Sequence, residues 1–273
     1  MTPAETRLAA TILLLRDGPL LLEVFMVERH HKIDFAEGAL VFPGGKVEAS
    51  DSAPELKAFC RGAVSESENE NSVRVAAIRE TFEECGVLLA RPRGMQDLID
   101  GTRRESIAAR YRDELQNGNS SMLDMVRAEE LELACDLLVP FAHWITPEFM
   151  PKRFDTHFFL VAAPPDQLAV HDGFESVDSL WTTIPSALEL EKTGQRTIIF
   201  PTLENMKKLG RSRSVTGALE NARRDTIVTV LPRFSKDPDG TMMMEIPEEA
   251  GYDTVRSAMP EPGGGKQATT KSS

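Results

Sequence analysis

Three glutamates stand close together in the segment from Arg79 to Val87, which reads RETFEECGV. In a helix, Glu80, Glu83 and Glu84 occupy positions i, i+3 and i+4 and therefore share one face. Carboxylates at this spacing repel each other by roughly 0.2–0.5 kcal/mol per pair. The pattern leaves two readings: a solvated acidic face, which is commoner for such a triplet alone, or a site for a divalent cation with oxygen ligands.

The segment before the acidic helix bears on this choice. Residues 38–42 read GALVF and predict a short strand, which Pro43-Gly44-Gly45 ends because a regular strand cannot continue through that turn. A glycine pair allows the backbone to come close to a ligand or to a helix. The order of strand, glycine turn and acidic helix therefore favours a functional site over a solvated face.

These segments together resemble the signature of the Nudix hydrolases, G-x5-E-x7-R-E-U-x-E-E-x-G-U, in which U is a bulky apolar residue. The positions that agree are Gly45, Arg79, Glu80, Glu83, Glu84, Gly86 and Val87. Asp51 stands where the family has glutamate, and Thr81 replaces a bulky apolar residue. Arg79 follows Gly45 by 34 positions, where the signature has 14, so about 20 residues are inserted before the helix.

Three further segments, 35–45, 88–92 and 153–160, resemble one branch of this family. That branch contains the peroxisomal coenzyme A diphosphatases and their bacterial relatives, and it carries a similar insertion. The resemblance extends from about Leu8 to about Leu209. It implies an α+β fold of the Nudix type, an α/β/α sandwich with a mixed sheet, an insertion between the Pro-Gly-Gly turn and the catalytic helix, and a C-terminal extension.

The same resemblance implies the roles of individual side chains. The residues implied as catalytic and as ligands of Mg²⁺ or Mn²⁺ are Glu80, Glu83 and Glu84. Arg79 is implied as a structural residue that pairs with a carboxylate and fixes the turn. Family members often add a carboxylate from a distant loop. Glu175 and Asp178 are the candidates here, and exposed loop charges are the alternative reading for both.

Substrate contacts are expected from two further places. Gly44 and Gly45 form the turn beside the acidic helix, where the backbone can approach a ligand. Arg153 precedes a predicted strand that borders the site, and its guanidinium could bind a phosphate in a bidentate manner. The alternative for Arg153 is a surface ion pair with Asp155 or another acid.

The remaining pattern predicts a chain of mixed elements. Apolar runs at 9–16 and 21–29 flank Asp17-Gly18-Pro19 and predict a hairpin. Ser72 is the expected N-cap of the acidic helix, after an exposed acidic loop over 65–71. Further strands are expected at 137–144, 154–163 and 179–184, and further helices at 103–116, 120–132, 185–190 and 202–209. Segments 226–232 and 241–246 predict a second hairpin, with the methionine run 242–244 packed in it.

We expect one domain over residues 1–259. It contains the insertion, at about 52–71, and the extension, from about residue 210. Residues 260–273 are rich in glycine, serine and lysine and predict a disordered tail.

Composition excludes several functional classes. The net charge of −12 argues against a nucleic-acid partner, because phosphate binding needs clustered lysine and arginine. No apolar run approaches the roughly 18 residues of a membrane span. The three cysteines lack metal-ligand spacing and fit a reducing cytoplasm.

The expected function is metal-dependent hydrolysis of a nucleoside-linked diphosphate, with coenzyme A or acyl-CoA as the leading substrate class. The products would be 3′,5′-ADP and (acyl-)4′-phosphopantetheine. Two alternatives remain open. One is hydrolysis of another nucleoside diphosphate derivative, such as a nucleotide sugar or a dinucleotide. The other is a Nudix-like module that binds a nucleotide without catalysis. The sequence does not indicate an oligomeric state.

Overall fold

A mixed β-sheet forms the centre of the structure, a computed structural model that describes residues 4–29, 38–62, 68–167 and 176–258. The sheet has the order β10-β7-β8-β1-β2-β3, with β4 beside β1 and β9 beside β2. Its strands are β1 (Thr6–Asp17), β2 (Leu22–Arg29), β3 (Leu40–Val41), β4 (Gly44–Lys46), β7 (Val139–Ile145), β8 (Arg153–Ala162), β9 (Ser176–Thr183) and β10 (Thr229–Val230). The parallel pair β1 and β8 lies in the middle, and the hairpin expected from the first two apolar runs is confirmed.

Strand β1 contributes to two hydrophobic cores because its side chains alternate between the faces of the sheet. Ile12 and Leu14 pack on one face and Leu13 and Leu15 on the other, and all four are fully buried. A strand buried on both faces reads as a continuous apolar run. The run near the N-terminus is therefore the central strand of a layered fold.

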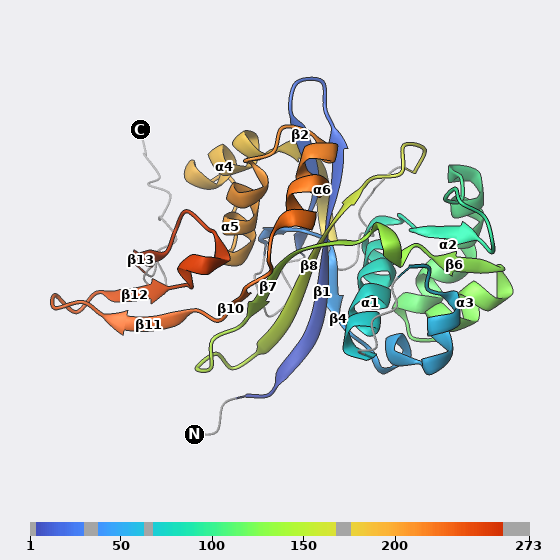
Figure 1. Cartoon of the computed structure of the whole chain (residues 1–273), viewed down its shortest axis with the longest axis horizontal. Helices are drawn as coiled ribbons and strands as arrows, with labels where there is room; N and C mark the ends of the chain where they lie inside the picture. Colours follow the sequence, from blue (N-terminus) through green and yellow to red (C-terminus); the bar gives the residue numbers. More distant parts are fainter. Residues whose placement is uncertain (1–3, 30–37, 63–67, 168–175, 259–273) are drawn as a thin grey trace, which may run out of the picture.

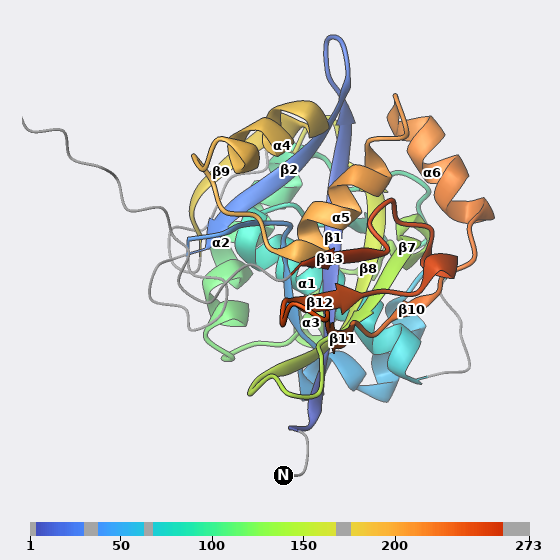
Figure 2. The same cartoon turned by 90° about the vertical axis from the view of Figure 1, so that its left-hand side faces the viewer.

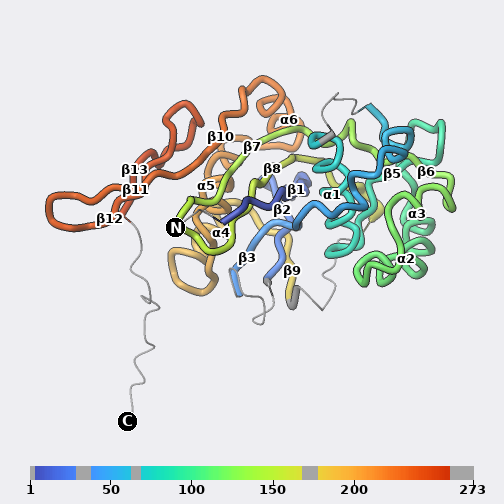
Figure 3. The backbone as a smooth tube through the Cα atoms, turned by 90° about the horizontal axis from the view of Figure 1, so that it is seen from below, coloured from blue at the N-terminus to red at the C-terminus, as the bar shows by residue number. Residues whose placement is uncertain are grey.

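Helices cover both faces of this sheet (Figure 1). On one side lie α1 (Glu68–Cys85), α2 (Gly101–Gln116) and α3 (Met122–Ala128), and on the other α4 (Ile184–Lys192), α5 (Phe200–Leu209) and α6 (Val215–Arg224). The view from below shows the sheet as the middle of the three layers (Figure 3). The α+β sandwich with a mixed sheet that the sequence predicted is confirmed. Within the described ranges, none of the helices is long and apolar enough to cross a membrane.

Helix α1 begins earlier than the sequence predicted. Ser72 is not its N-cap but lies inside the helix, buried, with its hydroxyl donating to the carbonyl of Asn69 at 3.0 Å. The expected acidic loop therefore forms the first turn of the helix from Glu68 onward, and residues 63–67 lie outside the described residues. The polar composition of this turn is compatible with a helix because its solvent-facing side chains need no apolar contact.

The inserted segment is partly built into the core. A short 3-10 helix, η1 (Ala49–Ser52), leads into it, and it contains a second, η2 (Pro54–Phe59). Leu56 and Phe59 of η2 are buried in the cluster on the α1 side of the sheet. A small two-stranded sheet, β5 (Ala90–Pro92) with β6 (Leu131–Leu133), lies beside it. Strand β6 occupies part of the segment that the sequence assigned to a helix over 120–132, so α3 is shorter than expected.

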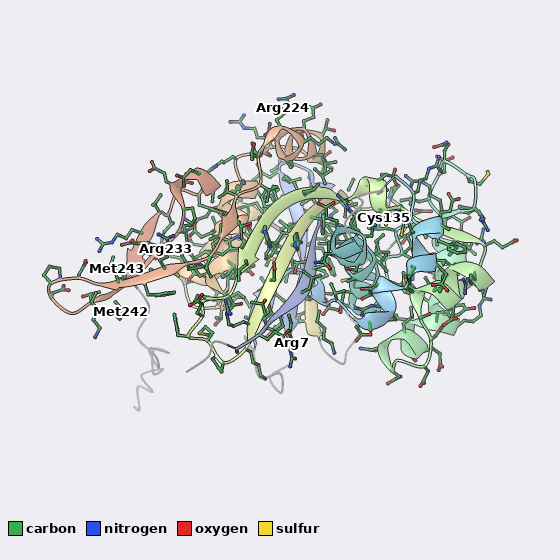
Figure 4. The ribbon with its side chains drawn as sticks, turned by 60° about the horizontal axis from the view of Figure 1, so that its bottom comes forward. Arg7, Cys135, Arg224, Arg233, Met242 and Met243 are labelled. Carbon is green, nitrogen blue, oxygen red and sulfur yellow. The ribbon has the colours of Figure 1, made fainter. Side chains whose placement is uncertain are left out.

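The C-terminal segment forms a three-stranded arm, β11 (Arg233–Lys236), β12 (Met242–Glu245) and β13 (Arg256–Ala258). The second hairpin therefore exists, but its first strand starts at Arg233, and Thr229–Val230 of the expected strand joins the central sheet instead. The arm lies on the α5 side of the molecule (Figure 2). Met242 and Met243 lie toward its tip, far from Cys135 beside α1 (Figure 4). The methionine run is thus partly exposed, which agrees with packing at the edge of the hairpin and not in a core.

Candidate active site on helix α1

The glutamate-bearing half of α1 is buried on all sides. From Val73 to Cys85 the helix lies between the sheet and α2, and nearly every residue is buried. Glu80, Glu83 and Glu84 are only 8, 7 and 7% exposed. The reading of these residues as a solvated acidic face is therefore wrong. Burying charged carboxylates is expensive unless cations or hydrogen bonds compensate.

One compensating cation is Arg79. Its Nε and Nη2 donate to the Asp51 carboxylate at 3.0 Å each, and Nη2 also donates to the Lys46 carbonyl at 3.0 Å. Its Nη1 lies 3.1 Å from both Glu80 Oε1 and Glu83 Oε2. The structural role expected for Arg79 is confirmed, since one guanidinium joins the end of β4, η1 and two glutamates of α1.

Asp51 completes this arrangement from the start of the insertion. It is 2% exposed, and besides Arg79 it accepts a hydrogen bond from the Glu48 backbone N–H at 2.9 Å. A shorter carboxylate thus occupies the place of the family's glutamate. The extra residues follow Asp51, so the insertion does not disturb the contact between Asp51 and Arg79 of α1.

The glycine pair brings the start of β4 against α1. The Gly44 N–H donates to Glu84 Oε2 at 2.9 Å. A Cβ atom at Gly45 would lie 2.5 Å from Glu80 Oε1, closer than real Cβ contacts allow. Gly44 has φ of +153°, and a Cβ there would lie 2.7 Å from Thr11 Cα. Of the two uses that the sequence left open for this pair, the structure shows close approach to the helix.

The buried carboxylates outnumber the one guanidinium that pairs with them. Burial raises the pKa of Glu83 to about 8; Arg79 opposes this shift, and Glu80 and Glu48 add to it. Glu83 Oε1 is buried and has no hydrogen-bond partner. An unpartnered buried carboxylate oxygen among further carboxylates fits a hard divalent cation with oxygen ligands. Glu80, Glu83 and Glu84 therefore supply oxygen donors of the kind that Mg²⁺ or Mn²⁺ prefers.

Arg112 is a contributor that sequence reasoning missed. From α2, its Nε and Nη2 donate to the carbonyls of Glu83 and Glu84 at 2.8 and 3.0 Å. These carbonyls belong to the last turn of α1, where no intrahelical partner exists. Arg112 thus stabilises the end of the helix at the two glutamates. Arg112 lies far from the acidic motif in the sequence, and no local pattern indicates this contact.

The other residues singled out in the sequence lie outside this set. Arg153 donates from Nε to the Thr146 carbonyl at 3.0 Å and from Nη1 to the Ala4 carbonyl at 2.9 Å. It therefore joins strand ends, a contact that the sequence analysis did not consider. Asp178 is paired with Arg196 at 2.8 Å. Glu175 lies outside the described residues.

Comparison with known proteins places this arrangement in a family. A family model describing the NUDT19 Nudix domain matches residues 61–209, more than half of the 273-residue chain. An acyl-coenzyme A diphosphatase NUDT19 of Xenopus laevis is 28% identical over 225 residues, covering 68% of this chain and 59% of that protein. The relative of the same name from Gallus gallus is 27% identical over 290 residues, covering 82% and 76%.

The fold agrees with these matches. The crystal structure of a NUDIX hydrolase from Alicyclobacillus acidocaldarius superposes with a TM-score of 0.62 at 28% identity. It covers 80% of this chain and 96% of that one. The chain spans about three fifths of the Xenopus relative, so the match concerns the Nudix domain rather than the whole of that protein. Motif, fold and family model agree that the chain belongs to the NUDT19 Nudix domain family of the Nudix hydrolases.

Proposed function

We propose that this chain hydrolyses the diphosphate bond of coenzyme A or acyl-CoA. Addition of water across the P–O–P linkage would release 3′,5′-ADP and (acyl-)4′-phosphopantetheine. The observation that carries the proposal is the buried glutamate set on α1, with Glu83 Oε1 unpartnered. The names of the two relatives, acyl-coenzyme A diphosphatases, support the choice of substrate class.

In this proposal Glu80, Glu83 and Glu84 hold one or more Mg²⁺ or Mn²⁺ ions. The bound cation supplies Lewis-acid stabilisation of charge on the diphosphate oxygens and lowers the pKa of a water molecule. Arg79 holds the Glu83 carboxylate from one side, through Oε2. The Gly44 N–H orients Glu84 through Oε2. A glutamate of this set or of a loop takes the proton of the attacking water.

Substrate recognition in this proposal uses local contacts, because a net charge of −12 repels an anion at long range. Gly44 and Gly45 place the start of β4 beside the carboxylates, where the diphosphate would bind. A guanidinium has five N–H donors, of which the carbonyl contacts of Arg153 use two. We therefore retain Arg153 as the candidate contact of the 3′-phosphate and Glu175 as the candidate extra carboxylate.

We also place the reaction in the cytoplasm. The three cysteines, Cys60, Cys85 and Cys135, are free thiols, which fits a reducing compartment.

The test is a substrate panel on the full chain with Mg²⁺, with Mn²⁺ and with a chelator. The panel contains CoA, an acyl-CoA, dephospho-CoA, a nucleotide sugar and a dinucleotide, and products are identified by mass. We expect cation-dependent release of 3′,5′-ADP from CoA or acyl-CoA. Cleavage of the nucleotide sugar or dinucleotide alone would overturn the substrate class. Nucleotide binding without any cleavage would identify a binding module.

A further inference from the structure

A second group of potential metal ligands lies on the central sheet, away from the glutamates. His143 of β7 and His157 of β8 face each other across the antiparallel pair, and Asp155 stands two residues before His157. One ligand atom from each of the three side chains lies within 4.8 Å of the other two. None of these residues belongs to the Nudix motif.

The two imidazoles are arranged around a single carboxylate oxygen. Their rings stack with centroids 4.1 Å apart and an interplanar angle of 18°. His143 Nε2 is hydrogen-bonded to Asp155 Oδ1, and His157 Nε2 lies 3.8 Å from the same oxygen. At 3.8 Å, His157 and Asp155 are too far apart for a hydrogen bond. Donors about 2.0–2.2 Å from a tetrahedral Zn²⁺ are separated from each other by roughly 3.4 Å. The stacked rings have nearly parallel lone pairs, so an ion would be admitted by a turn of the imidazoles about their side-chain bonds together with a movement of the carboxylate.

Strand β10 supplies a supporting contact. Thr229 lies opposite His143 in the parallel pair β10–β7, and its Oγ1 is 2.8 Å from His143 Nδ1. In the metal-free chain His143 Nε2–H donates to Asp155 and Nδ1 accepts from this hydroxyl. Binding of an ion at Nε2 would displace that proton, and Nδ1–H would then donate to the same hydroxyl. Metal-binding histidines commonly have their second ring nitrogen held in this way.

Accessibility also favours a ligand role. The side chains of His143, Asp155 and His157 are 17, 30 and 31% exposed, so an ion can reach them from solvent.

The donor types select the class of cation. Imidazole nitrogen suits Zn²⁺, Ni²⁺, Co²⁺ and Cu²⁺, whereas Mg²⁺ prefers oxygen ligands throughout. We propose that His143, Asp155 and His157 form a binding site for a divalent transition-metal ion of the zinc class, separate from the glutamate set. Three protein ligands leave a coordination position for water or another donor.

The site lies on the same face of the sheet as the glutamates. His157 pairs with Ala10 of β1, and Ala10 pairs with Gly45 of β4, so the three residues form one row across the sheet. Two strand spacings separate His157 from Gly45, about 10 Å. Among the described residues, the ligand atoms that lie within 4.8 Å of one another here are those of His143, Asp155 and His157, without a glutamate of α1. Variants can therefore test the two sites independently, and failure of one proposal leaves the other standing.

The first experiment measures metal binding by the full chain after dialysis against a chelator. Zn²⁺ is titrated by calorimetry in the presence of millimolar Mg²⁺, and Co²⁺ by its visible absorption. We expect His143→Gln and His157→Gln to weaken binding of both ions by at least tenfold. Thr229→Val should weaken binding by a smaller factor than either histidine variant, because it removes only the contact that orients His143.

The matched controls are His171→Gln, which removes a histidine elsewhere in the sequence, and Glu84→Gln, which alters the other site. Both should bind Zn²⁺ as the parent does. All variants keep the three cysteines, so a thiolate site would show unchanged binding. Parental Zn²⁺ affinity and an unchanged Co²⁺ spectrum in both His143→Gln and His157→Gln would overturn the proposal, as would absence of binding by the parent.

A second measurement uses the parent chain and does not depend on variant folding. Diethyl pyrocarbonate modifies accessible imidazole nitrogens, and mass spectrometry of peptides locates the modified histidines. We expect Zn²⁺ to protect His143 and His157 at least fivefold, while the modification rate of His171, whatever it is without Zn²⁺, does not change. Equal modification rates of His143 and His157 with and without Zn²⁺ would contradict the proposed site.

Discussion

The two potential metal sites of this molecule differ in almost every physical respect. The glutamate set comes from five consecutive positions of one helix, is nearly excluded from solvent and contains only oxygen donors. The histidine set comes from two strands, is partly exposed and contains two nitrogens and one oxygen. The comparison shows that a ligand set carried by one element can be recognised in sequence, whereas a set formed by strand pairing depends on register.

The same comparison explains how one fold could keep two cations apart. Hard oxygen donors suit Mg²⁺ or Mn²⁺, and imidazoles suit the zinc class. In addition, the glutamates are fixed by Arg79 and by the Gly44 N–H, while Asp155 lies at a partly exposed strand position. Substitutions in the buried glutamate region should therefore have larger effects than substitutions in the exposed histidine region.

The largest effect is expected where the buried ion pair is broken. Asp51→Ala leaves the Arg79 guanidinium without its principal partner, and loss of one member of a buried pair costs about 3–5 kcal/mol. Urea unfolding in chelator should show this loss. Asp97→Asn, at an exposed position, is the control, and Asp155→Asn should cost less than about 1 kcal/mol. A similar small loss for Asp51→Ala would show that the pair contributes little to stability.

The next largest effect concerns turnover. Glu84→Gln keeps the size of the side chain but removes one negative oxygen donor, and we expect cation-dependent hydrolysis to fall about 100-fold or more, that is by roughly 2.7 kcal/mol in the barrier. Glu83→Gln should behave alike. Glu114→Gln on the exposed surface of α2 is the control. Parental rates for either site variant in saturating Mg²⁺ would remove that residue from the site.

A smaller effect is expected in the pH dependence of stability. The pKa of Glu83 is about 8 in the folded chain, above its ordinary value of 4.5. Folding therefore favours the protonated form, and this contribution is present below pH 4.5 and lost as pH rises toward 8. Glu83→Gln should make the metal-free protein more stable at pH 8, by on the order of 2 kcal/mol, with little change at pH 4.5. Identical pH slopes for parent and variant in urea unfolding would contradict this.

The smallest effect concerns Arg153. If its guanidinium binds the 3′-phosphate, Arg153→Ala should raise KM for CoA about fivefold more than KM for dephospho-CoA, which corresponds to roughly 1 kcal/mol for one hydrogen bond. Loss of the two carbonyl contacts should affect the KM values for CoA and dephospho-CoA equally, because both are measured on the same variant. Equal changes of KM would restrict Arg153 to joining the strand ends.

Much of the layered fold could be predicted because the local signals agree with it. The hairpin β1–β2 has apolar runs around a glycine-proline turn, and the acidic helix has a motif of fixed spacing. The start of α1 was misplaced because Ser72 is a good capping residue in isolation, but tertiary contacts bury it. Helix α6 was not predicted at all, although Val215, Ala218 and Ala222 provide its apolar face.

The parts of the site that escaped prediction depend on distant partners. Arg112 reaches the end of α1 from another helix, and no local pattern marks an arginine that binds carbonyls. His143 and His157 lie in the segments predicted as strands, 137–144 and 154–163, and only the register of β7 against β8 brings them together. Such pairings become visible only when the strand order is known.

The inserted segment has a consequence for which changes this chain can tolerate. Leu56 and Phe59 of η2 lie in the main core, and burial of such a side chain contributes about 1.5–3 kcal/mol. Deletion of the segment would therefore remove part of the interior, whereas substitution of its exposed residues would not. The chain should accept changes in the surface composition of this segment more readily than changes in its length.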